Sequence, residues 1–305
     1  MKKRITGLVL LLCLISLPGW CDSEWKNSYA LGQTDAWYGS DEAARVAENV
    51  LLYQRDTGGW PKNEEMQAEL SDAQKATIAA QKSDKSCFDN GATTTEMRFL
   101  AKVYKHQPEE RYREAFNKAL SCILEAQSVC GDGWPQYWPR RVGEKQKSLM
   151  KYSDFITFND NLTTNILRVL NDVAEGSGDF ADIVDEDSRK AARESYQKGL
   201  QCILNCQIRN DDGELTVWCA QHYPDTYLPA VGRRFELPSY SGAESADIAS
   251  FLMGIDNPSA AVWQAVEGAV KWFETHAMEN KKQESFTNKD GQSDRRIVDA
   301  PGKRL

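Results

Sequence analysis

Apolar residues recur three and four positions apart in four segments of the chain, and each segment ends near a turn. In one segment they are Phe116, Leu120, Ile123 and Leu124, which would line a single face of an α-helix. The pattern predicts amphipathic helices over residues 41–56, 109–127, 188–207 and 259–277.

A second set of helical segments lies between the first, over residues 89–105, 159–175 and 241–255. Each opens with Asp, Asn, Ser or Thr, whose side chains cap the unpaired amides at a helix start. The middle of each segment is apolar. Because the two sets alternate along the chain, they predict a series of helical hairpins.

A short phrase marks the end of the first three segments: a glutamine, a glycine-containing turn and a tryptophan. The glutamines are Gln54, Gln127 and Gln207, which are 73 and 80 residues apart. The first two copies read "QRDTGGW" and "QSVCGDGW", and a looser copy follows Gln207. A period of this length corresponds to one helical hairpin with long loops, repeated three times.

Three hairpins arranged in a ring would place the turns with Trp60 and Trp134 on one rim, beside the polar starts of the inner helices. We therefore predict an all-α fold, an α/α toroid of three repeated helical hairpins plus a further outer helix. Its long loops would lie on one rim, where loops of this length usually serve a function. An open solenoid is the alternative, and the tryptophans could instead only fill the gap between hairpins.

The first residues have the pattern of a secretory signal peptide: basic "MKKR", apolar "ITGLVLLLCLISLP", then polar "GWCDSEW". The apolar run is shorter than the ~20 residues of a membrane-spanning helix. We expect a signal peptide over residues 1–21 and a single domain over 22–305. The protein would then be secreted or periplasmic, without stable membrane association after cleavage, and lipidation of Cys21 stays open.

Cysteine spacing and net charge narrow the possible ligands. The six remaining cysteines lack paired C-x-x-C units, which disfavours a zinc site, and the sequence does not select a disulfide pairing. The net charge of -8 disfavours nucleic acid, whose binding depends on basic surface. We expect a monomer.

Two aspartates stand just before successive inner helices, Asp89 in "FDNGATTTE" and Asp160 in "FNDNLTT". Their simplest role would be helix capping. Because both occur at the same offset in consecutive repeats, they are also candidates for a converging pair. Two carboxylates suit a hard cation such as Ca²⁺, or acid-base work on a glycosidic bond.

Basic residues in the predicted loops complement these acids: Lys62, Arg140, Arg141, Arg233 and Arg234. Arginine pairs with carboxylates through two parallel hydrogen bonds, and tryptophan faces stack on sugars. Carboxylates, arginines and tryptophans on one rim therefore indicate an anionic sugar polymer as the ligand.

Six short motifs resemble polysaccharide lyase family 10, the pectate lyases: "GGWPKN", "DNGATTTE", "DGWPQYWP", "ITFNDN", "WCAQH" and "GRRFELPSYSGAES". They occur in the family's order between about Leu51 and Ile255. The resemblance implies a helical toroid and endo β-elimination on polygalacturonate assisted by Ca²⁺.

By this resemblance Asp89 and Asp160 would hold calcium, and Arg233 would bind the uronate, with Arg295 in "SDRRIV" as a second candidate. The catalytic set would be Asp89, Asp160 and Arg233. The substrate groove would be lined by Trp60, Lys62, Asn63 and Trp134 in addition to the two arginines.

The chain departs from the family in two places. Phe155 stands where the family commonly has a histidine, before "ITFND". Family members also continue past "RIVDAPGKRL" into a Trp-Ala-Arg-Phe-Tyr segment whose arginine is regarded as the catalytic base, whereas this sequence ends at Leu305. Either the chain is truncated or another group replaces that arginine, and impaired activity with a largely intact groove is expected.

Other functions remain open at this level. A glycoside hydrolase would use Asp89 and Asp160 as acid and base, and a non-catalytic uronate-polysaccharide-binding protein would keep the groove without turnover. A purely structural helical scaffold would need none of the rim tryptophans. Endo or exo action and methyl-ester tolerance are not encoded in any recognisable pattern.

Overall fold

The structure is a computed structural model that describes residues 24–140, 152–233 and 236–305. The expected signal peptide over residues 1–21 lies outside the described residues, as do Cys21, Arg141 and Arg234.

The all-α prediction is confirmed, since each predicted helical segment contains a helix. The outer helices are α1 (Asp41–Tyr53), α4 (Glu110–Ser128), α6 (Glu186–Cys206) and α8 (Ala260–His276). The inner helices are α3 (Thr94–His106), α5 (Leu162–Glu175) and α7 (Gly242–Met253). Short helical turns lie at η1 (Trp25–Tyr29), η2 (Asp35–Gly39), η3 (Asp89–Gly91), η5 (Tyr152–Asp154), η6 (Asn159–Asn161) and η7 (Gly178–Phe180).

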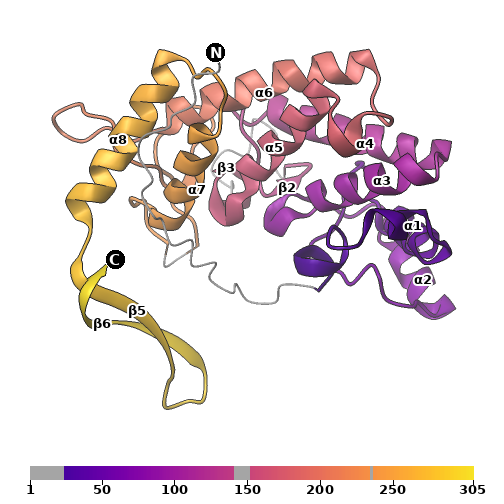
Figure 1. The fold of residues 1–305 in the computed structure, drawn as a ribbon, viewed down its shortest axis with the longest axis horizontal. Coiled ribbons are helices and arrows are strands. Elements are labelled where there is room, and N and C mark those ends of the chain that lie inside the picture. The colour runs from indigo at the N-terminus through magenta and orange to yellow at the C-terminus, as the bar shows by residue number, and fades with distance from the viewer. Residues whose placement is uncertain (1–23, 141–151, 234–235) are drawn as a thin grey trace.

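The hairpins follow one another across the molecule (Figure 1). Inner helix α3 packs on α4, α5 on α6 and α7 on α8, while α4 also contacts α6 and α6 contacts α8. Their apolar faces form one continuous buried core that runs through the repeats. This arrangement agrees with the predicted repeats, and closure into a ring stays a prediction.

Glutamine side chains join successive outer helices at equivalent positions. The Nε2 group of each donates twice, once to a carbonyl of its own turn and once to a carbonyl of the next outer helix. The acceptors are Gly58 and Ala115 for Gln54, Asp132 and Ser195 for Gln127, and Thr216 and Ala265 for Gln207. The glutamine recurs in the sequence because each copy makes the same contact between neighbouring hairpins.

The tryptophans of the repeat are core residues, which corrects the groove-lining role predicted for Trp60 and Trp134. Both are 0% exposed, as is Trp218 in the third copy. Each indole N–H donates to a carbonyl of the preceding outer helix: Val50 at 2.7 Å, Ile123 at 3.0 Å and Ile203 at 2.8 Å. A ring enclosed on both faces cannot stack on a sugar, so the gap-filling alternative holds.

The Gly-Gly pair before Trp60 is required by close packing. Gly58 has φ +99°, and a Cβ there would lie 2.2 Å from the Lys118 carbonyl oxygen in α4. A Cβ on Gly59 would lie 2.6 Å from Oγ1 of Thr93. These two positions let the turn sit between the outer helix α4 and the start of the inner helix α3.

Two-residue strands tie the rim loops together. Strand β1 (Ser86–Cys87) pairs with β2 (Tyr137–Trp138), and β3 (Ile156–Thr157) pairs with β4 (Gln221–His222), both antiparallel. The tryptophan carbonyls add to these ladders, because Trp60 accepts from the amide of Cys87 and Trp134 from that of Thr157. The rim is therefore a hydrogen-bonded surface rather than a set of independent loops.

Three parts of the chain differ from the sequence prediction. Inner helices α3 and α5 start later than predicted, because η3 and η6 precede them. The polar stretch after Glu64, in which no helix was predicted, contains α2 (Asp72–Ala80), which begins with a capping box between Ser71 and Gln74. Residues after α8 form a hairpin of β5 (Glu279–Thr287) and β6 (Ser293–Arg304), which projects from the helical body (Figure 1).

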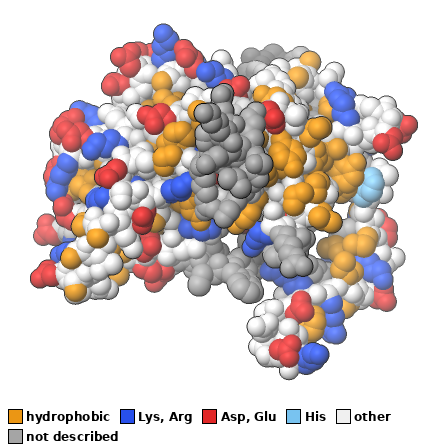
Figure 2. All heavy atoms as spheres, turned by 180° about the vertical axis from the view of Figure 1, so that it is seen from behind, with side chains coloured by type: hydrophobic (Ala, Val, Ile, Leu, Met, Phe, Trp, Pro, Cys, Tyr) orange, Lys and Arg blue, Asp and Glu red, His pale blue; other side chains and the backbone are white. Residues whose placement is uncertain are grey.

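No helix in the described ranges is long and apolar enough to cross a membrane. The six described cysteines are buried, and none of them forms a disulfide. Burial raises the pKa of the Cys87 thiol to about 12, so this thiol is protonated at neutral pH. The face shown in Figure 2 mixes acidic and basic side chains over most of its described surface.

We expect Gln127→Leu to lower the free energy of unfolding by roughly 2–4 kcal/mol, because each buried polar group left unpaired costs about 1–3 kcal/mol. The groups concerned are the carbonyls of Asp132 and Ser195 and the Ser195 hydroxyl, which donates to Gln127 Oε1 at 2.8 Å. Urea unfolding followed by circular dichroism measures the change. The control is Gln201→Leu on the exposed face of α6. Equal stability losses for both variants would contradict a stabilising role for the Gln127 hydrogen bonds.

Candidate active site

The rim holds the two aspartates singled out in the sequence, in turns η3 and η6, which contact each other. Asp89 is 2% exposed, whereas Asp160 is open to solvent. Neither caps a helix, because the N-cap residues of α3 and α5 are Thr93 and Asn161. The capping interpretation is therefore wrong, and the convergence of the two carboxylates is what the turns provide.

The aspartates are not equivalent in the repeat, which corrects the predicted common offset. Thr93 Oγ1 donates to the carbonyl six residues before it, and Thr163 Oγ1 does the same. In that register Asp160 matches Asn90, and both have left-handed backbones with φ of 52° and 54°. Asp89 therefore lies one position earlier in its turn than Asp160 does in its own.

Asp89 is held by two donors on one of its oxygens. Oδ2 accepts from the Lys62 ammonium and from Gln136 Nε2 at 2.7 Å. Among the described residues, Oδ1 is buried without a hydrogen-bond donor. The carboxylate is thus fixed in orientation, with one oxygen left to a ligand.

Lys62 reaches Asp89 because it follows the turn that Gly58, Gly59 and Trp60 fix between the helices. Burial alone disfavours the Lys62 ammonium, but the hydrogen bond and the charge of Asp89 outweigh it and raise the pKa of Lys62 above its usual range. Lys62 also lies 5.9 Å from the centre of the Tyr137 ring. It remains a cation throughout the physiological pH range.

Asp160 is protonated more easily than an ordinary aspartate. Partial burial and then the Asp89 carboxylate raise the pKa of Asp160 to about 6, and Glu244 at the start of α7 adds to this effect. The charge of Lys26 acts in the opposite direction. Asn159 Nδ2 donates to Asp160 Oδ2 at 2.6 Å.

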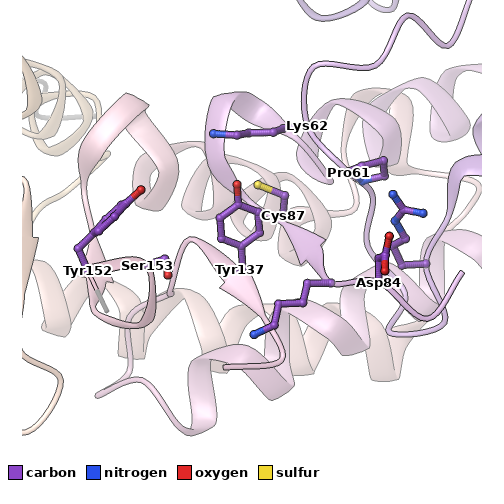
Figure 3. Close-up of a pocket in the computed structure, with 9 residues that line it drawn as sticks. Pro61, Lys62, Asp84, Cys87, Tyr137, Tyr152 and Ser153 are labelled. Carbon is purple, nitrogen blue, oxygen red and sulfur yellow. The ribbon is translucent and has the colours of Figure 1, made fainter. Parts of the chain in front are cut away.

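A cavity of about 590 Å³ opens beside Lys62, the residue that binds Asp89, and neither Asp89 nor Asp160 is among its lining residues. It is lined by Lys62, Tyr137 and Tyr152 together with Arg55, Pro61, Asp84, Lys85, Cys87 and Ser153. Figure 3 shows Tyr152 across the cavity from Tyr137, with Lys62 above Cys87. The cavity therefore combines aromatic rings with cationic groups, as a groove for an acidic sugar requires.

Arg233 lies near this site and is exposed, in the loop before α7. Its Nε donates to Glu236 Oε1 at 2.9 Å, and Nη2 contacts the same oxygen. This hydrogen bond raises the pKa of Arg233 above its usual value, and the charges of Tyr152 and Asp160 add to the effect. In this structure Glu236 therefore occupies the position expected for a uronate carboxylate.

The other predicted site residues are more scattered. Asn63 lies at the rim, where its Oδ1 accepts from Asn90 Nδ2 at 3.2 Å. Arg295 lies on β6, opposite Ser285 in the projecting hairpin, and is not among the residues that line the cavity. Phe155, in the place of the family's histidine, is buried against Tyr223. Arg140 lines a different cavity, together with Phe155 and Tyr223.

The residues at the rim could supply some, but not all, of the oxygen ligands of a calcium ion. Calcium takes about 6–8 oxygen ligands. Asp89 and Asp160 supply two carboxylates, one with a buried oxygen that lacks a donor. In the described ranges no three His, Cys, Asp or Glu side chains gather closely enough to form a metal site. A calcium ion here would take its remaining oxygens from water or from an acidic ligand.

Sequence reasoning missed several of these contacts. Gln136 and Tyr137 lie in "DGWPQYWP", a motif in which only Trp134 was predicted to line the groove. Glu244 belongs to a quoted motif but was given no role. Lys26 precedes the first repeat, so no periodic pattern could indicate it.

Comparison with known proteins gives a family and two similar structures. A family model described as pectic acid lyase matches residues 54–305. A structure of a family 10 polysaccharide lyase from Cellvibrio cellulosa matches with a TM-score of 0.72 and 32% identity, over 92% of this chain and 78% of that one. A mutant of that lyase, in complex with trigalacturonic acid, matches with a TM-score of 0.70 and 32% identity, over 88% and 79%. A search of curated proteins found no match.

We expect Lys62→Met to destabilise the protein, because it leaves the Asp89 carboxylate buried without its cation. The loss should be about 1.5–3 kcal/mol, the range for a hydrogen bond to a charged group. Asp89→Asn in the Lys62→Met background should recover most of it, since a neutral amide needs no counter-charge. Thermal and urea unfolding of the four proteins give the coupling energy, and simple additivity would show that the pair does not interact.

Proposed function

The chain belongs to the pectic acid lyase family and is a lyase, and we propose that it cleaves polygalacturonate by calcium-assisted β-elimination. The observation that carries the proposal is the Asp89–Asp160 pair, in which Asp89 binds Lys62, and Lys62 in turn lines an aromatic and cationic cavity. The similar lyase that binds trigalacturonic acid supports an acidic polysaccharide as the substrate.

The chemistry explains why cations and carboxylates are needed together. β-Elimination removes the proton at C5, beside the uronate carboxyl, and negative charge develops on that carboxyl group. Positive groups placed there in advance stabilise the charge as it forms. When bound, calcium would act as a Lewis acid on the same carboxylate, held on the protein side by Asp89 and Asp160.

The protein's own residues have distinct tasks in this proposal. Lys62 keeps Asp89 oriented and offers a permanent positive charge at the cavity. Arg233 would exchange Glu236, whose Oε1 accepts from both Nε and Nη2, for a uronate carboxylate that the planar guanidinium could bind through two parallel hydrogen bonds. Tyr137 and Tyr152 replace the buried tryptophans as the aromatic surfaces for sugar rings.

The cellular setting follows from the same proposal. Polygalacturonate is a polymer outside the cell that degrades it, so a secreted or periplasmic location agrees with the signal-peptide pattern over residues 1–21. We further propose a single domain over residues 22–305 that acts as a monomer.

We expect the parent protein to release unsaturated, ultraviolet-absorbing products from polygalacturonate, and a chelator to abolish their release. Asp160→Ala should lower turnover about 100-fold or more, the scale for removing one electrostatic stabiliser, and should weaken calcium-dependent binding of polygalacturonate. Asp211→Ala in an exposed turn is the control.

Products with new reducing ends but no new double bond would contradict elimination and indicate a hydrolase. Binding of polygalacturonate without any turnover would indicate a binding protein. Unchanged calcium affinity of Asp160→Ala in the presence of substrate, measured by calorimetry, would remove Asp160 from the metal site.

We expect Arg233→Lys to bind polygalacturonate more weakly by roughly 1–3 kcal/mol, because lysine keeps the charge but loses the planar fork. The matched control is Arg45→Lys on α1, because Arg45 also pairs with a glutamate three residues away. Calorimetric titration of both variants measures the effect. Equal affinities of Arg233→Lys and the parent would exclude two-point binding of the uronate by Arg233.

A further inference from the structure

A short N-terminal turn, η1, reaches the rim from outside the repeated hairpins and is anchored at several points. Trp25 is 2% exposed, and its indole Nε1 donates to Glu96 Oε1 at 2.8 Å. The backbone amides of Glu24 and Trp25 donate to the Glu65 carboxylate at 2.9 and 3.2 Å. The residue that follows Trp25 is therefore held in a defined place.

That residue is Lys26, which is half-buried. Its Cε lies 3.6 Å from the point where Gly91 in η3 would carry a Cβ, and Gly91 is two residues from Asp89. The positive charge of Lys26 lowers the pKa of Asp160, against the effects of burial and Asp89. The Lys26 side chain therefore lies against η3, and its charge acts on the Asp160 carboxylate.

The anchor and the site share one structural element. Glu96, which holds Trp25, lies in the first turn of α3, and η3 with Asp89 directly precedes that helix. A movement of the start of α3 would therefore shift Asp89 and Lys26 together.

We propose that Lys26 is a further substrate-binding residue, whose ammonium binds a carboxylate of the acidic sugar chain beside Asp160. The inference rests on the proposed function and extends it to a segment outside the repeats. An ammonium has three donors, so Lys26 can bond a protein oxygen and a substrate carboxylate at once. Lys62 binds Asp89, so in this proposal each aspartate of the pair has one lysine beside it, Lys62 for Asp89 and Lys26 for Asp160.

The test compares Lys26→Gln, Lys26→Arg and the exposed control Lys75→Gln on α2. Calorimetry with calcium and trigalacturonate measures binding, and product absorbance measures KM and kcat. Lys26→Gln should weaken binding about 10-fold or more, since a hydrogen bond between charged groups is lost, and should raise KM more than it lowers kcat. Lys26→Arg should recover most of the affinity, and the Lys75 variant should match the parent.

A second variant separates the anchor from the charge. Trp25→Phe keeps a buried ring but loses the indole donor to Glu96, so it should also weaken binding of trigalacturonate. Parent affinity in Lys26→Gln overturns the proposal, and so does a loss that comes with a lower unfolding temperature and that Lys26→Arg does not recover.

The two proposals fail in different ways. If the parent binds trigalacturonate but forms no unsaturated product, the lyase proposal fails, while the binding ratio of Lys26→Gln to the parent still decides the role of Lys26. If the parent turns over polygalacturonate and Lys26→Gln has the same KM and affinity, only the inference about Lys26 fails.

Discussion

The amide groups of Gln54, Gln127 and Gln207 set the geometry on which the remaining structure depends. Each amide satisfies a carbonyl in its own turn and a carbonyl in the next outer helix, so one side chain fixes a turn and the spacing of two hairpins. Buried carbonyls at these places have to be paired, because an unpaired one is unfavourable. The tryptophan after each turn then fills the space that this spacing creates.

The buried glutamines and tryptophans also fix the positions of the side chains at the rim. Trp60 is locked by its indole hydrogen bond and by its backbone contact with Cys87, so Lys62 two residues later has little freedom in where it lies. Gln136, two residues after Trp134, is placed in the same way and completes the environment of Asp89. The buried tryptophans Trp60 and Trp134 thus determine where Lys62 and Gln136 lie at the rim, although neither tryptophan is exposed.

The sequence predicted the helices well because amphipathic spacing is a local property of each segment. It also identified Asp89, Asp160 and Lys62, which the structure brings together. It failed for Trp60 and Trp134, since periodicity places a tryptophan at a turn but does not say which way the ring points. Lys26 was out of reach, because its place depends on Trp25 and Glu96, which are 71 residues apart in sequence.

The hairpin of β5 and β6 was missed for a different reason: no element was sought after the last helical period, although "NKDG" is a typical turn sequence between two strands. The capping box of α2 could also have been recognised in the sequence, but it lies in a polar stretch for which no helix was predicted. Both omissions concern elements outside the repeat, where a repeat-based analysis has no template.

The hairpins of the scaffold repeat, but Asp89 and Asp160 do not occupy equivalent positions in them, since they are offset by one residue. Equivalent acids in consecutive repeats would present two similar half-sites, related by the same step that relates the hairpins. Here the matching positions hold an acid and an amide in opposite order, and the third repeat has Ser241 and Gly242 there. A sugar chain has distinct reducing and non-reducing ends. A site without internal symmetry can distinguish the two directions in which such a chain could lie.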